Sequence, residues 1–368
     1  MAALILKSLE IRRFRAFQHL VIEKLGRVNL VVGKNNVGKS CLLEALQLYA
    51  TRAHPTFIWQ ILGAHDEDTR SLNYDIEEVL SIVKYLFYGR QDITELVEPI
   101  EIGPINSPEE KLLVSIKFYT LRTDEEGRRT LQPSQPTLFD DPVENPTPRF
   151  FIQLGKNRSI IYPLDLRGST SRLLRSDLKE INSVFTASNG LDKRTVAELW
   201  DKIALTDLQK EVLEALRIIA PGLQDISVIG DLNAKRRRFP IVKVTGIAEP
   251  LPIRSLGDGM QRLLGIALAL VNARDGLLLI DEIENGLHYS TQPDLWRLIF
   301  QLARDLNVQV FATTHSWDCI EAFQEAAQED VQEGGVLIRL EHKKGAVGAT
   351  LFSEQKLAVV TRAQIEVR

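Results

Sequence analysis

Residues 33–40 read Gly-Lys-Asn-Asn-Val-Gly-Lys-Ser and directly follow an apolar run from Val28 to Val32. The run predicts a buried strand, and the leucines after Ser40 recur at helical spacing. A glycine-rich turn between a strand and a helix directs backbone N–H groups at a phosphate. The chain is therefore restricted to an α/β fold that binds a nucleotide at the end of a strand.

Each residue type in this loop suits a different contact with a nucleotide. Gly33 and Gly38 let the backbone turn inward, Lys39 can reach the β- and γ-phosphates, and Ser40 can coordinate Mg²⁺. We therefore expect ATP and Mg²⁺ as cofactors. The residues expected to line the nucleotide are Gly33, Lys34, Asn35, Asn36, Val37, Gly38, Lys39, Ser40 and Cys41.

Two further strand ends carry polar side chains. The run Leu277 to Ile280 ends in Asp281 and Glu282. Successive side chains on a strand point to opposite faces, so we expect Asp281 at the metal and Glu282 at the attacking water as general base. A second run, VQVFATT, delivers His315 to a sheet edge where it can hydrogen-bond the γ-phosphate. Lys39, Glu282 and His315 are the expected catalytic residues.

A second anion site is predicted before the helix that begins near Met260. Ser255, Gly257 and Gly259 precede this helix, and a glycine-rich helix N-terminus favours an anion. Because the first loop already holds one nucleotide, the second site is expected to face the γ-phosphate bound by another copy. This predicts a head-to-tail homodimer with two shared nucleotides.

The length of 368 residues predicts more than one unit. Strands and helices alternate at both ends, whereas the middle contains strand runs separated by acidic and proline-rich turns, followed by helical patterning from Leu173 to about Ala220. We expect an α/β P-loop NTPase of ABC-ATPase-like architecture with inserted antiparallel β and helical subdomains. The expected parts are residues 1–50 and 239–368 for the ATPase core and 51–238 for the insertions.

Composition narrows the function classes little. The formal net charge is −4, so any contact with DNA must come from a local basic patch, such as Lys235 to Arg238 or Arg167, Arg172 and Arg175. Only two cysteines occur, without metal or redox spacing. No signal peptide or membrane anchor is evident, which predicts a cytoplasmic protein.

Five stretches together, LKSLEIRRFRAF, GKNNVGKS, SLGDGMQRLL, LLLIDEIENGLH and FATTHS, resemble the ABC, SMC and RecF class of ATPase heads. They look most like the ATPase domain of OLD (overcoming lysogenisation defect) family proteins and their stand-alone relatives, often described as AAA-family ATP-binding proteins. The resemblance covers both ends of the chain and is poor from about Thr51 to Arg238.

The resemblance implies an ATP hydrolase that dimerises around two ATP-Mg and switches a partner in DNA repair or defence against phage. About fifty residues follow His315, too few for the nuclease domain of many OLD proteins, so a nuclease-like effector is expected to be a separate chain. Two alternatives remain open: a RecF-like, ATP-dependent DNA clamp, and a scaffold that binds ATP without hydrolysing it.

The resemblance assigns further residues and leaves alternatives open at some of them. Gly257 and Asp258 occupy the centre of the signature, the glutamine loop could contain Gln153 or Gln91, and Arg15 and Phe17 could approach the adenine. Glu284 to His288 match the loop that crosses the dimer interface. The acidic triplet Asp66-Glu67-Asp68 is expected to be a solvated turn.

Overall fold

The computed structural model describes residues 3–69, 75–93, 97–123, 129–134, 146–164, 178–230, 238–330, 335–343 and 345–352. In these residues a six-stranded sheet carries the phosphate loop, in the order β16-β15-β3-β14-β13-β9. Its neighbouring strands are parallel except β16, which is antiparallel to β15. The strands are β3 (Val28–Val32), β9 (Ser183–Thr186), β13 (Leu277–Ile280), β14 (Gln309–Thr313), β15 (Gly335–Lys343) and β16 (Ala346–Phe352).

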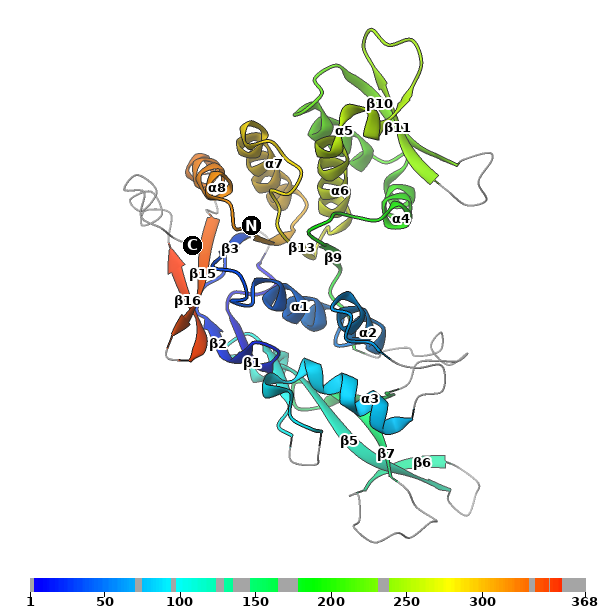
Figure 1. The fold of residues 1–368 in the computed structure, drawn as a ribbon, viewed down its shortest axis with the longest axis vertical. Helices are drawn as coiled ribbons and strands as arrows, with labels where there is room; N and C mark the ends of the chain where they lie inside the picture. Colours follow the sequence, from blue (N-terminus) through cyan, green and yellow to red (C-terminus); the bar gives the residue numbers. More distant parts are fainter. Residues whose placement is uncertain are drawn as a thin grey trace.

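Helices cover both faces of this sheet, so its strands are apolar on both sides. Val28, Leu30 and Val32 of β3 belong to one hydrophobic core, whereas Val31 belongs to the other. This alternation explains why the run is uniformly buried instead of half polar. Helix α1 (Lys39–Ala50) lies on one face, and the other carries α6 (Asp258–Asn272), α7 (Gln292–Asp305) and α8 (Trp317–Glu329), as Figure 1 shows.

An antiparallel sheet lies against the α1 side, in the order β2-β1-β4-β5-β7-β8 with β6 paired to β5. Helices α2 (Pro55–Ala64) and α3 (Ile76–Val83) pack in the same core. The expected antiparallel insertion is therefore confirmed. Its strands are β1 (Leu9–Phe14), β2 (Phe17–Ile22), β4 (Ile100–Gly103), β5 (Leu112–Thr123), β6 (Arg129–Pro133), β7 (Thr147–Leu154) and β8 (Arg158–Pro163).

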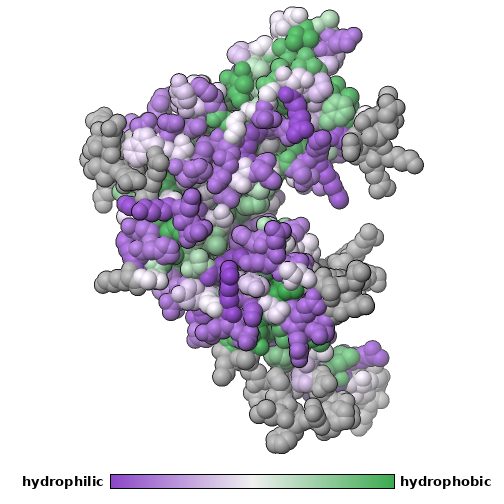
Figure 2. All heavy atoms as spheres, viewed as in Figure 1, coloured by the Kyte–Doolittle hydropathy of each residue, from purple (hydrophilic) through white to green (hydrophobic). Residues whose placement is uncertain are grey.

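A third, three-stranded sheet forms the opposite end of the molecule (Figure 1). It contains β10 (Leu223–Gly230), β11 (Arg238–Val244) and β12 (Leu251–Pro252), and packs with α4 (Lys193–Ile203) and α5 (Leu208–Arg217). Hydrophobic side chains reach the surface here (Figure 2), among them Leu205, Ile229 and Ile247. Short 3₁₀ turns occur at Lys84–Leu86, Tyr88–Arg90, Pro108–Glu110, Ile253–Leu256 and Tyr289–Thr291.

Two segments differ from the sequence-based expectation. Residues Ser183–Thr186 were expected within a helical stretch but form β9, because Val184 and Phe185 favour a strand and complete the parallel sheet beside β13. The alternation of apolar and polar residues from Leu4 to Ile11 predicts a first strand there, whereas β1 is Leu9–Phe14, since β2 and β4 pair with it at those residues. Strand β15 pairs with β3 and so lies within the core sheet, in the part of the chain expected to complete the ATPase core.

Sheets therefore cross the expected division of the chain. Strands β1 and β2 precede residue 50 but pair with the antiparallel insertion, and β9 lies between residues 51 and 238 but pairs with the core. Non-local pairing of this kind leaves no mark in composition. The division at residues 50 and 238 remains a prediction about folding units. No helix in the described part of the chain is long and apolar enough to cross a membrane.

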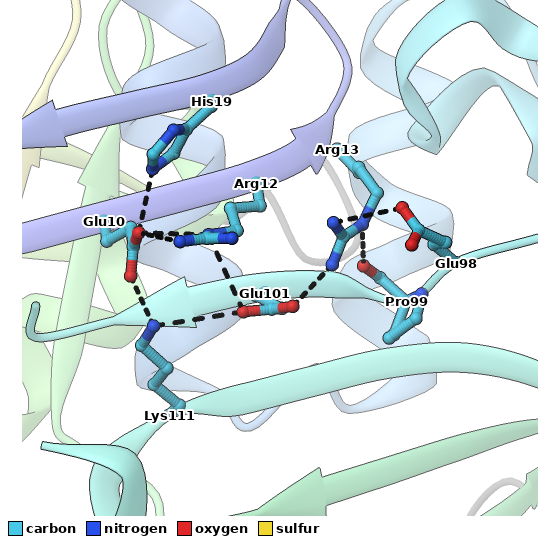
Figure 3. Close-up of polar contacts among 8 residues, drawn as sticks. All are labelled: Glu10, Arg12, Arg13, His19, Glu98, Pro99, Glu101 and Lys111. Atoms are coloured by element: carbon cyan, nitrogen blue, oxygen red, sulfur yellow. Dashed lines mark hydrogen bonds and ion pairs between the residues drawn. The ribbon is translucent and has the colours of Figure 1, made fainter.

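A network of ion pairs ties β1 to β4 and to the start of β5 (Figure 3). The Glu10 side chain is 6% exposed and is bonded by Arg12, His19 and Lys111. Burial raises the pKa of Glu10, but these hydrogen bonds outweigh burial and lower that pKa to about 2. The carboxylate form of Glu10 therefore stabilises the junction between the two strands.

Glu10→Gln is expected to lower the free energy of unfolding at pH 7 by about 2 to 3 kcal/mol. Because the folded-state pKa is lowered, the stabilisation is present above the ordinary pKa of a glutamate. It is lost as the pH falls from the ordinary 4.5 toward about 2. Urea unfolding of both proteins at several pH values measures this. Glu98→Gln is the control, because Glu98 is an exposed member of the same network and should contribute little.

Candidate functional site

The phosphate loop requires glycine at both of its glycine positions. Gly33 has φ +148° and a Cβ there would lie 2.5 Å from the carbonyl oxygen of Leu340. Gly38 has φ +98° and a Cβ there would lie 3.0 Å from the ring of Phe17. No side chain of the described residues caps the N-terminus of α1 at Gly38. The first N–H groups of α1 are therefore left for an anion.

The other loop residues divide into exposed and packed positions. Lys34, Asn35 and Asn36 are exposed, whereas Val37 is buried in the core beside α1. Cys41 is partly buried, and burial raises the pKa of its thiol to about 11. Its thiol is therefore protonated near neutral pH, and Cys41 has only its backbone to offer a phosphate.

Lys39 is folded back onto its own loop. Its Nζ donates to the carbonyl oxygens of Gly33, at 2.8 Å, and Lys34, at 3.2 Å. Burial lowers the pKa of Lys39, and the charges of Asp281, Glu282 and Glu284 oppose that effect. A partly desolvated cation surrounded by carboxylates is suited to an anionic ligand with its own divalent cation.

Ser40 and Asp281 meet as the sequence analysis expected of two magnesium ligands. Ser40 Oγ donates to Asp281 Oδ2 at 3.1 Å, and Thr313 Oγ1 donates to Asp281 Oδ1 at 2.6 Å. Among the described residues no group of three or more His, Cys, Asp or Glu could hold a metal alone. This donor pair fits Mg²⁺, which commonly takes one or two protein oxygens and fills its shell with phosphates and water.

Glu282 and His315 lie next to each other at the carboxyl ends of adjacent strands. His315 Nδ1 is 3.6 Å from Glu282 Oε1, and the two side chains are 51% and 36% exposed. Glu282 has φ +46°, and its backbone N–H donates to Thr313 Oγ1. Asn285 Nδ2 donates to Glu282 Oε2 at 2.7 Å. The carboxylate of Glu282 is thus oriented while open to solvent, as a base that must reach a water requires.

Arg262 links helix α6 to this edge of the sheet, a connection that the sequence analysis missed. It is 7% exposed and donates to the carbonyl oxygens of Ala187, Asp281 and Glu282 at 2.8 to 2.9 Å. Burial lowers the pKa of Arg262, and the charges of Glu284, Asp281 and Glu282 oppose this. One buried cation therefore fixes the backbone of both candidate site carboxylates to α6.

Arg262→Met should lower the free energy of unfolding by about 3 kcal/mol, because three carbonyl groups lose charge-assisted hydrogen bonds. Guanidinium unfolding measures this. The matched control is Arg254→Met, which removes an exposed arginine that donates to Gln261 near the start of the same helix. Equal stability of the two variants would contradict a structural link through Arg262.

The N-terminus of α6 has the geometry expected of a second anion site. Gly257 has φ +99° as its N-cap, and no side chain of the described residues caps it. Ser255 and Asp258 are exposed beside it. Gly259 leaves room for the loop after β13, since a Cβ there would lie 3.0 Å from the carbonyl oxygen of Gly286.

Arg15 and Phe17, which could approach an adenine or could equally be surface or core residues, are both buried. Phe17 is 0% exposed and packs against the phosphate loop. The Arg15 side chain is 6% exposed and pairs with Glu44 of α1 and with Glu67. Glu67 is therefore not part of a solvated turn, because a buried cation needs a carboxylate partner. Neither Arg15 nor Phe17 is free to contact a base.

The two candidates for the glutamine loop also lie elsewhere. Gln153 is on β7 of the antiparallel sheet, where it donates to the carbonyl oxygen of Gly155, and Gln91 is exposed after a 3₁₀ turn. The edge position beside Asp281 belongs to residues 187–190 after β9, and Asn285 donates to the carbonyl oxygen of Ser188 there. Because β9 was not expected, sequence reasoning missed this segment.

The basic residues proposed to contact DNA lie mostly beyond the described ranges. Arg167, Arg172, Arg175 and residues 235–237 are outside them. Arg238 is described and forms an ion pair with Asp201 of α4. Its positive charge is therefore matched by an acidic neighbour.

Two family models match the chain. "AAA ATPase domain" matches residues 5–132, and "AAA domain, putative AbiEii toxin, Type IV TA system" matches residues 241–318. These ranges contain the phosphate loop in the first and both α6 and His315 in the second. These two parts of the chain are similar to AAA-type ATPase domains, and the fold is similar to that of an SMC head.

Relatives and solved structures agree with this assignment. An ATP/GTP phosphatase of Helicobacter pylori is 26% identical over 351 residues, which cover 88% of this chain and 89% of the relative. The methionine import ATP-binding protein MetN 1 of Rhodococcus jostii is 25% identical over 208 residues, 55% of each chain. An SMC head bound to the C-winged helix domain of ScpA matches 96% of this chain and 99% of its own, with TM-score 0.51 and 13% identity. The expected fold class is confirmed.

Proposed function

We propose that this chain hydrolyses ATP with Mg²⁺, and that ATP brings two copies together head-to-tail to switch a partner. The observation that supports the proposal is a series of hydrogen bonds that joins the side chains of Ser40, Asp281 and Thr313. This series lies next to Glu282 and His315. In this proposal Ser40 and Asp281 are the metal ligand pair and Glu282 is the general base. These residues and His315 lie at one sheet edge, beside the helix terminus proposed to bind phosphate.

Each residue has a separate task in this proposal. Lys39 and the first N–H groups of α1 bind the phosphates, while Ser40 and Asp281 hold Mg²⁺, which neutralises phosphate charge when bound. Glu282 accepts a proton from the attacking water and His315 hydrogen-bonds the γ-phosphate. Phosphoryl transfer needs mainly positioning and charge stabilisation, which these groups supply.

The homodimer rests on surface features at the same edge. The N-terminus of α6 presents uncapped N–H groups, and Tyr289, 63% exposed, lies just after the loop that follows β13. The rings of His288 and Tyr289 lie in contact, with 4.3 Å between their centroids and planes tilted by 37°. An exposed aromatic pair near an open anion site is the kind of surface that a second copy covers.

The biological role follows from resemblance and is proposed on that basis. OLD-type proteins suggest DNA repair or defence against phage, in the cytoplasm, with a separate nuclease-like effector. The description of one matched family refers to a type IV toxin–antitoxin system, and the matched SMC head structure is bound to ScpA. Leu205, Ile229 and Ile247 lie in the part of the chain from α4 to β12, and their exposed side chains offer a partner apolar contacts.

Light scattering of the Glu282→Gln variant, with and without ATP and Mg²⁺, tests the central proposal. We expect the mass to double only with ATP and Mg²⁺, because binding is kept while hydrolysis is blocked. Lys39→Ala added to this variant should abolish the doubling. An unchanged mass would contradict the proposed dimer of the isolated chain. ATP hydrolysis would then be tested separately, by phosphate release.

The RecF-like clamp gives a different result in a binding assay. It predicts affinity for duplex DNA that requires ATP, falls steeply with salt and weakens when residues 235–238 are neutralised. Absent or salt-insensitive binding would remove this alternative.

A further inference from the structure

Glu284 is a buried carboxylate to which the proposed reaction assigns no task. Its side chain is 8% exposed, and its Oε1 accepts the backbone N–H of His315 at 3.0 Å. Its Oε2 is buried and has no hydrogen-bond partner within the described part of the chain. Sequence analysis placed Glu284 in a loop that crosses a dimer interface, but its side chain faces His315 of its own subunit.

Two carboxylates therefore meet the same atom of one ring. His315 Nδ1 is 3.4 Å from Glu284 Oε1 and 3.6 Å from Glu282 Oε1. An ionised carboxylate only accepts hydrogen bonds, so both neighbours favour a proton on Nδ1. With Nδ1 directed at the carboxylates, Nε2 is the ring atom turned away from both of them. The proton position on a histidine is set by the partner of its other nitrogen, as in other catalytic and metal-binding histidines.

Two cations interact electrostatically with Glu284. Lys39 and Arg262 are the cations whose pKa values the charge of Glu284 raises, against the lowering effect of burial. Glu284 therefore has one oxygen bonded to the backbone N–H of His315 and two cations within electrostatic range.

We infer that Glu284 is a positioning residue for ATP hydrolysis: it fixes the backbone and ring of His315 and keeps the proton on Nδ1, which directs Nε2 to the reacting phosphate or water. This inference rests on the proposed hydrolysis. It differs from a purely structural role because it assigns Glu284 an effect on the tautomer of His315. Glu282 keeps its own task at the attacking water.

The test combines kinetics with NMR of protein labelled with ¹⁵N at histidine, using His315→Gln to assign the His315 signals. In the wild-type protein we expect the Nδ1–H form at His315. Glu284→Gln keeps an acceptor for the His315 N–H but removes the charge beside Nδ1. We expect the Nε2–H form to increase and kcat to fall by about ten- to a hundredfold with little change in KM.

The control is Asp318→Asn, which removes an exposed carboxylate three residues after His315 and should leave both readouts unchanged. In a double-mutant cycle, Glu284→Gln should have almost no further effect on kcat once His315 is glutamine. If Glu284→Gln is poorly folded, Glu284→Asp, which keeps the charge, replaces it and should retain the Nδ1–H form.

An unchanged tautomer in Glu284→Gln, or fully additive effects in the cycle, would overturn the inference. The tautomer is measured without turnover. A wild-type protein that hydrolyses no ATP would therefore refute the proposed function while leaving the histidine geometry open to its own test.

Discussion

Replacing Glu282 by glutamine is expected to lower kcat for ATP hydrolysis by about a hundred- to a thousandfold. The carboxylate is 36% exposed, is held at one oxygen by Asn285 and lies beside His315, so it can reach a water while its orientation is fixed. Glutamine keeps the size and the contact with Asn285 but cannot accept the proton. Phosphate release under saturating ATP and Mg²⁺ measures the change.

The affinity for ATP distinguishes a variant that lacks only the general base from one that no longer binds the nucleotide. Glu282→Gln should bind ATP about as tightly as the wild-type protein, whereas Lys39→Ala should lose binding as well as hydrolysis, because Lys39 meets the phosphates directly. Asp305→Asn, at the last residue of α7, is a control for carboxylate removal away from the site. If Glu282→Gln kept a normal kcat, the general base would have to be another residue. If the wild-type protein itself hydrolysed ATP at a negligible rate, the non-hydrolysing scaffold would be the better description.

The parts of the site that could be predicted from sequence lie within short, local patterns. Residues 33–40 and the pair Asp281-Glu282 are recognisable because each follows an apolar strand directly, and the chemistry depends on that adjacency. Thr313 and His315 follow the same rule on β14. The structure places these three strand ends side by side, as the parallel order β3-β14-β13 requires.

The contacts that could not be predicted join residues far apart in sequence. Glu284 meets His315 across 31 positions, and Arg262 meets Ala187 across 75. A glutamate in a polar loop and an arginine in a helix have no distinctive pattern around them, since exposed residues of these types are common. Burial alone reveals their roles, and burial depends on packing that periodicity does not specify.

The fold shows the same limit. Strand β9 has four residues and pairs in parallel with β13, about ninety residues later in the chain, so no local turn signals it. The shift of β1 toward Phe14 likewise depends on its partners β2 and β4. Fold class was predictable because alternating strands and helices at both ends require one shared parallel sheet.

Mixing two inactive variants should restore hydrolysis if two copies share their sites. Lys39→Ala disables the phosphate loop, and Ser255→Glu adds a carboxylate beside the uncapped N-terminus of α6, where it would repel the γ-phosphate of the other copy. Ser255 is exposed in a 3₁₀ turn, so the substitution should not disturb folding. Each variant alone should be almost inactive, since both of its shared sites would carry one defect.

In a mixed dimer, one site combines both defects and the other combines an intact phosphate loop with an intact α6. If pairing were random, equal amounts would return about a quarter of wild-type activity, because half the dimers would be mixed and half of their sites intact. The mixed dimer would be joined by the one ATP in its intact site, since Lys39→Ala binds none in its own loop. Lys39→Ala mixed with Glu282→Gln is the control: both defects lie on the loop side of a site, so no intact site forms. Restoration in the first mixture alone requires that α6 acts on the nucleotide of the other copy. No restoration, with both variants shown to bind each other, would mean that α6 serves its own subunit and that the head-to-tail arrangement is wrong.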